Sequence, residues 1–226
     1  MNLLAVETST ELCSVALLRG GELFVEEVHA PNQHAERLLR LITRLFERAH
    51  LSPGAMDAFA FGQGPGSFTG IRIACGVVQG LAFGAHKPVI PVPSLLALAE
   101  QANESRVIAA IDARLGEAWL AAYSRMSGDW QPVIEPFLAK EGMLPDLPGR
   151  SWVATGSGFD AFAWLRGAYR HSVGHRIEGD LPRAGSVVRI AARRLSRGEV
   201  LAPDAAAPLY LRDKVALTTT ERQANS

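Results

Sequence analysis

A carboxylate followed by three hydroxyl side chains lies near the start of the chain. Glu7 ends a short apolar run, and Thr8, Ser9 and Thr10 follow it directly. Backbone N–H groups and hydroxyls in such a turn can donate to a phosphate, while the acid can hold a hydrated Mg²⁺. A polar hairpin turn is the alternative, because Ser and Thr favour turns through local hydrogen bonds.

A glycine-rich loop at 62–70 is the second candidate for chemistry. It holds four glycines and one proline in nine residues and precedes a predicted helix, whose N-terminus could bind an anion. It is not a P-loop, because no Gly-Lys-Ser/Thr follows, and a purely structural loop is the alternative. The residues assigned to this phosphate-binding or structural loop and the following turn are Gly64, Gly66, Ser67, Thr69, Gly70 and Arg72.

Other catalytic patterns are missing from the sequence. There is no Gly-x-Ser-x-Gly elbow and no Cys-x-x-Cys pair. His171 and His175 are four residues apart, but Gly174 lies between them and no acid completes a metal motif. The sequence therefore predicts no catalytic residue and no metal site.

Hydrophobic periodicity predicts the elements that position these loops. In the N-terminal half we expect strands at 3–6, 13–18, 23–28, 57–61 and 89–92, and helices at 34–50, from the glycine-rich loop to about 85, and at 95–101. Ser67 or Thr69 is expected to cap the second helix, and Ser94 the third. Further along we expect a strand at 152–154, helices at 159–170 and 187–196, a loop at 138–148 and an extended segment at 209–212.

The chain contains a weak internal repeat. Glu7 and Asp112 each end an apolar strand pattern, and each is followed by a second apolar run and a glycine-containing turn. This order predicts a duplicated hairpin unit, with a chance match as the alternative. We expect a first lobe over 1–105, a second lobe over 106–212 whose last segment could return to the first, and a disordered polar tail over 213–226.

Two helices carry unusual apolar patterns. Gly76, Gly80 and Gly84 recur every four residues, although each glycine costs a helix about 1 kcal/mol relative to alanine. Such a stripe lets another backbone approach closely, either a sheet of the same chain or a partner. In the helix at 34–50, Leu41 lies away from the main apolar stripe, so this helix could pack against a core and a partner at once.

Composition limits the function classes. Of 226 residues, 48% are hydrophobic, and 23 basic side chains balance 23 acidic ones, so the chain is a poor candidate for holding a nucleic acid alone. The first 105 residues carry 7 basic and 10 acidic side chains, and the rest carry 16 and 13. A basic cluster at Arg189, Arg193, Arg194 and Arg197 has no assigned role and could be a solvated helix face. Two cysteines exclude a disulfide scaffold, and without a signal-like N-terminus or a membrane-length apolar run we expect a cytoplasmic protein.

Several segments resemble one known family. They are 4–10, 14–17, 34–39, 64–72, 111–114 and 208–212, and the string Gly-Pro-Gly-Ser-Phe-Thr-Gly-Ile-Arg at 64–72 is the most specific. In order and spacing the chain resembles, to about Arg212, the TsaB (YeaZ) family of bacterial tRNA threonylcarbamoyladenosine biosynthesis proteins. The resemblance implies an α/β fold of two lobes, the actin, sugar kinase and Hsp70-like (ASKHA, RNase H-like) fold built from a duplicated unit.

The resemblance also implies a non-catalytic paralogue of the metal-binding transferase TsaD. That enzyme carries an Asn-His-x-x-Gly-His segment, and here Ser94 and Leu98 stand where its histidines would be. The turn after Asp112 also lacks a glycine-rich phosphate loop. We therefore expect an accessory subunit rather than an enzyme, in a complex that transfers a threonylcarbamoyl group to an adenosine of tRNA.

Partners follow from the same resemblance. It implies a heterodimer with TsaD through the helices at 34–48 and 71–84, a homodimer through the same surface, the ATPase TsaE as a further partner, and tRNA contact only through the complex. No cofactor is expected to bind this chain tightly alone, with ATP or ADP reserved for the assembled complex. The residues assigned to the interface are His34, Glu36, Arg37, Leu38, Leu41, Arg44, Leu45, Ile73, Gly76, Val77, Gly80 and Gly84.

Two other functions stay open at this point. A nucleotide-binding ATPase or kinase of the same fold would need both phosphate turns intact. A peptidase would need a nucleophile and a base, and the sequence offers no such pair.

Overall fold

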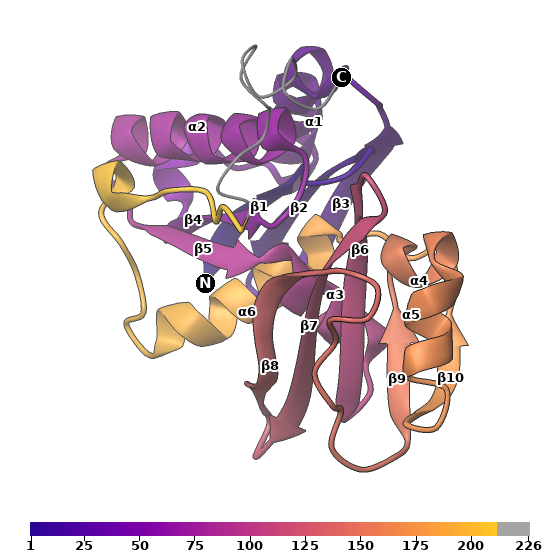
Figure 1. The fold of residues 1–226 in the computed structure, drawn as a ribbon. Coiled ribbons are helices and arrows are strands. Elements are labelled where there is room, and N and C mark those ends of the chain that lie inside the picture. The colour runs from indigo at the N-terminus through magenta and orange to yellow at the C-terminus, as the bar shows by residue number, and fades with distance from the viewer. Residues whose placement is uncertain (212–226) are drawn as a thin grey trace.

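The computed structural model describes residues 1–211, so Arg212 and the predicted tail at 213–226 lie outside the described residues. The chain forms two five-stranded sheets (Figure 1). The first sheet has the order β3-β2-β1-β4-β5, and the second has the order β10-β9-β6-β7-β8. The first holds β1 Asn2–Glu7, β2 Leu12–Arg19, β3 Glu22–His29, β4 Ala58–Gly64 and β5 Val89–Pro93. The second holds β6 Arg106–Arg114, β7 Glu117–Met126, β8 Asp129–Ala139, β9 Trp152–Thr155 and β10 Val173–Ile177.

Both sheets repeat one topology. In each, three consecutive strands pair antiparallel as a meander. The fourth strand then pairs in parallel with the first, and the fifth pairs in parallel with the fourth. The strands β1 and β6, which carry Glu7 and Asp112, occupy the same central position in their sheets. The predicted duplication is therefore confirmed, and with it the α/β fold of two lobes.

The helices divide the molecule into layers. The helices α1 His34–Ala49 and α2 Phe68–Ala85 cover the outer face of the first sheet, and the short helices α4 Ser157–Ala161 and α5 Ala163–Ala168 lie against the second (Figure 1). The helices α3 Ser94–Ala102 and α6 Ala184–Ser196 lie between the two sheets. Their apolar side chains join residues of both sheets in one continuous core, so the two lobes share a buried interface.

The end of the described chain lies against the first lobe. Helix α6 packs on strands of the first sheet. After it, Leu201 pairs with Val89 at the edge of β5, and a short 3₁₀ turn at Pro203–Ala205 lies beside α2. The Leu209 backbone N–H then donates to the Gln63 carbonyl at 2.7 Å, which places the last described residues at the end of β4.

The structure differs from the predicted elements in several places. Strand β8 was not predicted, since Pro132 and Pro136 interrupt its pattern, but an edge strand tolerates proline. Strand β10 was also missed, because it is short and contains a glycine. The helix predicted at 159–170 is two helices separated at Phe162, whose backbone is extended. Ser67 caps α2 as predicted, whereas Ser94 is the first residue of α3 and caps nothing.

Candidate functional site

The carboxylate of Glu7 is sealed inside the first lobe. It is fully buried, with Oε1 accepting from the Ser9 backbone N–H at 2.7 Å and Oε2 accepting from the Ser94 hydroxyl at 2.8 Å. A Cβ built on Gly62 would lie 1.9 Å from Oε2, so the glycine makes room for the acid. Burial raises the pKa of Glu7, although these hydrogen bonds act in the opposite direction. Glu7 therefore has a structural role here, and the predicted Mg²⁺-holding role does not fit its position.

The turn after Glu7 and the glycine-rich loop at 62–70 contact each other directly. The Thr8 hydroxyl donates to the Gly70 carbonyl at 2.8 Å, and the Ser67 N–H donates to the Ser9 carbonyl at 2.7 Å. A Cβ on Gly70 would lie 2.0 Å from the Thr8 carbonyl oxygen, so no larger residue fits there. A Cβ on Gly66 would lie 2.4 Å from Ser9. These contacts give the loops a structural role within the lobe. Ser9, Thr10, Ser67 and Thr69 also line the cleft between the lobes, so phosphate binding by these loops stays a prediction.

Polar side chains from both lobes face each other across a cleft. The cleft encloses about 560 Å³ and is lined by Thr10 and Thr69 from the first lobe and by Asp112 and Arg114 from the second. Asp112 accepts from the Arg114 backbone N–H at 2.8 Å and pairs with its guanidinium at 3.2 Å. The second acid is thus engaged by its own hairpin. Within residues 1–211 no group of three or more His, Cys, Asp or Glu side chains gathers as a metal site.

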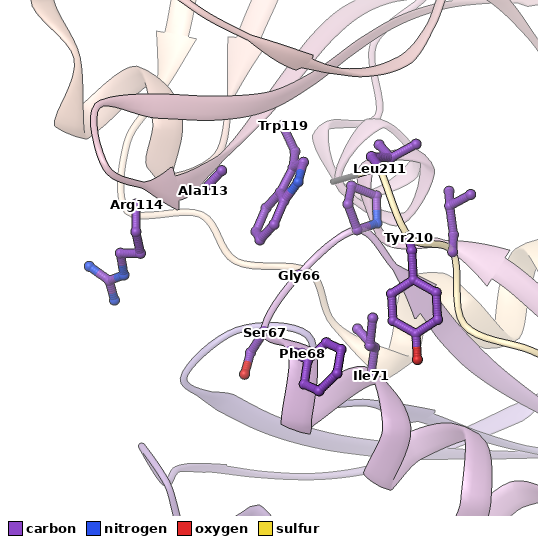
Figure 2. A pocket seen from close by; sticks show the side chains of 11 residues that line it. Gly66, Ser67, Phe68, Ile71, Ala113, Arg114, Trp119, Tyr210 and Leu211 are labelled. Carbon is purple, nitrogen blue, oxygen red and sulfur yellow. The ribbon is translucent and has the colours of Figure 1, made fainter. Parts of the chain in front are cut away.

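A smaller, mostly apolar cavity of about 190 Å³ lies where α2 begins (Figure 2). Phe68 and Ile71 of α2, Trp119 of the second lobe and Tyr210 of the C-terminal segment line it. The Arg72 guanidinium carbon lies 3.6 Å from the Phe68 ring centroid, and Nε donates to the Tyr210 hydroxyl at 2.7 Å. Arg72 therefore holds the C-terminal segment against α2, and a phosphate-binding role for it stays a prediction.

Three leucines and one histidine of the predicted interface residues on α1 are buried. Leu38, Leu41 and Leu45 lie in the core between α1 and the first sheet, and Leu41 is only 5% exposed. The expectation that Leu41 broadens the apolar face is wrong, because it lies three residues after Leu38 and four before Leu45, on one helix face. The leucine that faces solvent is Leu39, at 56% exposed.

His34 is also buried, at the start of α1. Its Nε2 lies 2.8 Å from the Thr10 carbonyl, so a neutral imidazole donates there and fixes the helix to the β1–β2 turn. Burial lowers the pKa of His34. An interface role for its side chain is therefore corrected to a structural one. The exposed residues of the predicted α1 set are Glu36, Arg37 and Arg44.

The glycine stripe of α2 faces outward. A Cβ built on Gly76, Gly80 or Gly84 meets no atom of residues 1–211 within 4 Å. Beside them Phe83 is 73% exposed, and Ile73 and Val77 are half-buried. Among the described residues the stripe therefore does not pack against the sheet, and the partner interpretation stays a prediction.

Helix α2 is apolar on both faces. Among the described residues it is the one helix long and apolar enough to span a membrane by length and composition alone. One face, with Ala74, Cys75, Val78 and Ala82, packs onto the first sheet. The helix thus packs one face in the core of the first lobe, while its second apolar face has no covering element within residues 1–211.

The basic cluster on α6 is mostly engaged in packing. Arg193 pairs with Glu100, Arg197 with Asp129, and Arg194 donates to the Pro91 carbonyl. Arg189 is exposed. Arg193, Arg194 and Arg197 therefore join the C-terminal end of α6 to its neighbours.

Comparison with known proteins agrees with this geometry. Residues 27–159 match the family model described as TsaD, tRNA N6-adenosine threonylcarbamoyltransferase. The chain is 38% identical to the tRNA threonylcarbamoyladenosine biosynthesis protein TsaB of Escherichia coli, over 96% of both chains. It is 35% identical to the protein of that name from Haemophilus influenzae, over 95% of both.

A solved structure shows the same fold. The structure of YeaZ from Pseudomonas aeruginosa superposes with a TM-score of 0.84 at 36% identity, covering 93% of this chain and 99% of that one. The identity and the shared fold extend across both lobes, and not only across the glycine-rich loop. The chain belongs to the TsaB (YeaZ) family of tRNA threonylcarbamoyladenosine biosynthesis proteins.

Proposed function

We propose that this chain is a non-catalytic partner subunit that the TsaD transferase requires for threonylcarbamoyl modification of adenosine in tRNA. Its family places it in the biosynthesis of that nucleoside. The sealed carboxylate of Glu7 and the Asp112–Arg114 pair support a role without phosphate or metal chemistry of its own. The position that would need a metal-binding histidine holds Ser94, whose hydroxyl is bonded to Glu7.

The outward face of α2 is the observation that carries the proposal. Three glycines without neighbours leave a flat strip along the helix, and Phe83 projects beside it. Helices pack about 8–10 Å apart, and small residues allow the closer end of that range. Burying an exposed aromatic ring contributes about 1.5–3 kcal/mol, so Phe83 gives such a contact an anchor.

The exposed residues of α1 extend the same surface. Leu39 supplies a second apolar side chain, and Glu36, Arg37 and Arg44 surround it with charge. An apolar centre with a charged rim suits a specific protein interface. TsaD is the proposed occupant, with a second copy of this chain taking its place when TsaD is absent. TsaE joins the complex as a further partner.

The remaining assignments fit a subunit that does not hold RNA itself. The chain has no net charge, and Arg193, Arg194 and Arg197 are engaged by contacts with neighbouring elements. The tRNA therefore reaches this subunit only through the complex, in the cytoplasm. ATP or ADP belongs to the assembled complex.

The test is co-purification with TsaD, using Gly80→Leu as the interface variant. A Cβ added at Gly80 meets no atom of the described residues within 4 Å, so the variant should fold. Because leucine favours helix over glycine, it should also be more stable by about 1 kcal/mol. It should nevertheless lose co-elution with TsaD and fail to support tRNA modification in the mixture.

Gly167→Leu in α5 is the matched control, since a Cβ there also meets nothing within 4 Å. It should pair with TsaD as the parent does. If Gly80→Leu still pairs and supports modification, the interface assignment is wrong. Modification by this chain without TsaD would overturn its non-catalytic role.

A further inference from the structure

One buried carboxylate joins four elements at the junction of the lobes. Glu100 of α3 is 8% exposed. It accepts from both terminal nitrogens of Arg193 on α6, at 2.7 and 3.0 Å. It also accepts from Arg125 on β7 and, at 2.7 Å, from the indole N–H of Trp130 on β8.

The elements that meet at Glu100 belong to both lobes. Helix α6 packs on the strands of the first sheet, while β7 and β8 are strands of the second. Helix α3 connects β5 of the first sheet to β6 of the second and packs against α6 (Figure 1). A movement that opened the lobes at this side would therefore pull donors away from a single carboxylate.

Such a movement would be costly. Burial raises the pKa of the Glu100 carboxyl, but hydrogen bonds from Arg193 and Trp130 and the charges of Arg193 and Arg125 bring it below its usual value. The carboxylate is thus charged and fully engaged. Glu100 is buried, whereas the side chains of Arg125 and Arg193 are 27% and 31% exposed. Removing one of these partners would leave the buried carboxylate with fewer donors, which costs more than losing an ion pair between two surface side chains.

A second polar contact on α3 also joins this helix to the second sheet. Gln101 donates to Asp180, and the same carboxylate accepts from the Thr155 hydroxyl of β9 at 2.9 Å. The continuous apolar core around α3 and α6 surrounds both contacts. Adjacent positions of α3 therefore hold the helix to α6 and to three strands of the second sheet.

We propose that Glu100 is an inter-lobe lock that fixes the two lobes in one relative orientation and so sets a constant width for the cleft between Thr69 and Asp112. The lock makes the molecule one rigid body rather than a clamp that closes on a ligand. This inference does not rest on the proposed partner role, because it concerns the isolated chain.

The test measures the distance between the lobes with two spin labels. Exposed Glu47 on α1 and Arg170 beyond α5 are replaced by labelled cysteine in a chain carrying Cys13→Ala and Cys75→Ala, whose native thiols are buried. The parent should give one narrow distance distribution, unchanged by millimolar Mg²⁺ and ATP. Glu100→Gln should add a longer, broader component, since a neutral amide cannot pair with both arginines.

Two further variants keep the test decisive. Arg125→Gln removes one donor and should broaden the distribution less than Glu100→Gln, while circular dichroism checks that both variants fold. Arg197→Gln is the control, because it removes a partly exposed pair between the residue that follows α6 and Asp129 of β8, and it should leave the distribution narrow. A broad parent distribution, a shift on adding Mg²⁺ and ATP, or a narrow distribution in folded Glu100→Gln would each overturn the lock.

Discussion

The Ser94 hydroxyl donates a 2.8 Å hydrogen bond to Oε2 of Glu7, joining the first turn of α3 to the end of β1 inside the first lobe. The two residues are 87 positions apart in the chain. Glu7 is the acid of the predicted phosphate turn, and Ser94 stands where the related transferase has a metal-binding histidine. In this structure the two side chains bond to each other instead.

Glu7→Gln should make the protein more stable at neutral pH. Burial raises the pKa of Glu7, so the folded state holds its proton more tightly than the unfolded state, and the resulting stability is lost as the pH rises through the folded pKa. Glutamine keeps the shape without the buried charge, and Ser94 can accept from its amide. The unfolding temperature of the variant should exceed that of the parent, by a difference that grows as the pH is raised from 4 to about 8. Glu11→Gln is the control, and an advantage independent of pH would refute this explanation.

Gly62→Ala should destabilise the first lobe. The new methyl would lie 1.9 Å from Oε2 of Glu7, so either the buried carboxylate or β4 must shift. Overpacking of this kind costs about 1–3 kcal/mol, measured by chemical denaturation. Gly54→Ala, where a Cβ meets no atom, should change stability by less than about 1 kcal/mol. Equal effects at the two positions would show that the close approach to Glu7 is not the cause.

Leu41→Ala and Leu39→Ala should separate stability from partner binding. Leu41 is buried, so its truncation should lower the free energy of unfolding by about 2–5 kcal/mol. Leu39 is exposed, and its truncation should change that free energy by no more than about 0.5 kcal/mol while weakening co-elution with TsaD. Denaturant titrations and co-purification measure the two effects. A large loss of stability in Leu39→Ala would contradict the placement of α1.

His34→Gln should flatten the acid side of the stability profile. Burial lowers the pKa of His34, so the folded state resists protonation, and stability falls as the pH drops below the usual histidine value of 6.5. Glutamine can still donate to the Thr10 carbonyl but does not titrate. The free energy of unfolding, measured from pH 7 to about 5, should therefore fall less steeply in the variant than in the parent. His171→Gln, at an exposed position, should leave the slope as it is.

The sequence was sufficient for the architecture. The repeated strand, acid and strand pattern around Glu7 and Asp112 predicted the duplicated lobes, and the apolar spacing predicted α1, α2 and most strands within a few residues. These features depend on local periodicity, which one face of an element imposes on its own residues. The stripe at Gly76, Gly80 and Gly84 was visible for the same reason. The edge strands β8 and β10 were missed, since prolines and a glycine weaken that local signal.

The direction in which side chains face was decided only by tertiary structure. Periodicity placed Leu41 outside the main apolar stripe, whereas the position of α1 on its sheet buries Leu41 and leaves Leu39 exposed. The sequence of the Glu7 turn is typical of a phosphate site, but in the structure Gly62 and Ser94, which are distant in sequence, surround its carboxylate. The arginines of α6 read as a basic surface until Glu100 and Asp129 pair with them. In each case the deciding contact is long-range, and burial by a distant segment leaves no mark on the local sequence pattern.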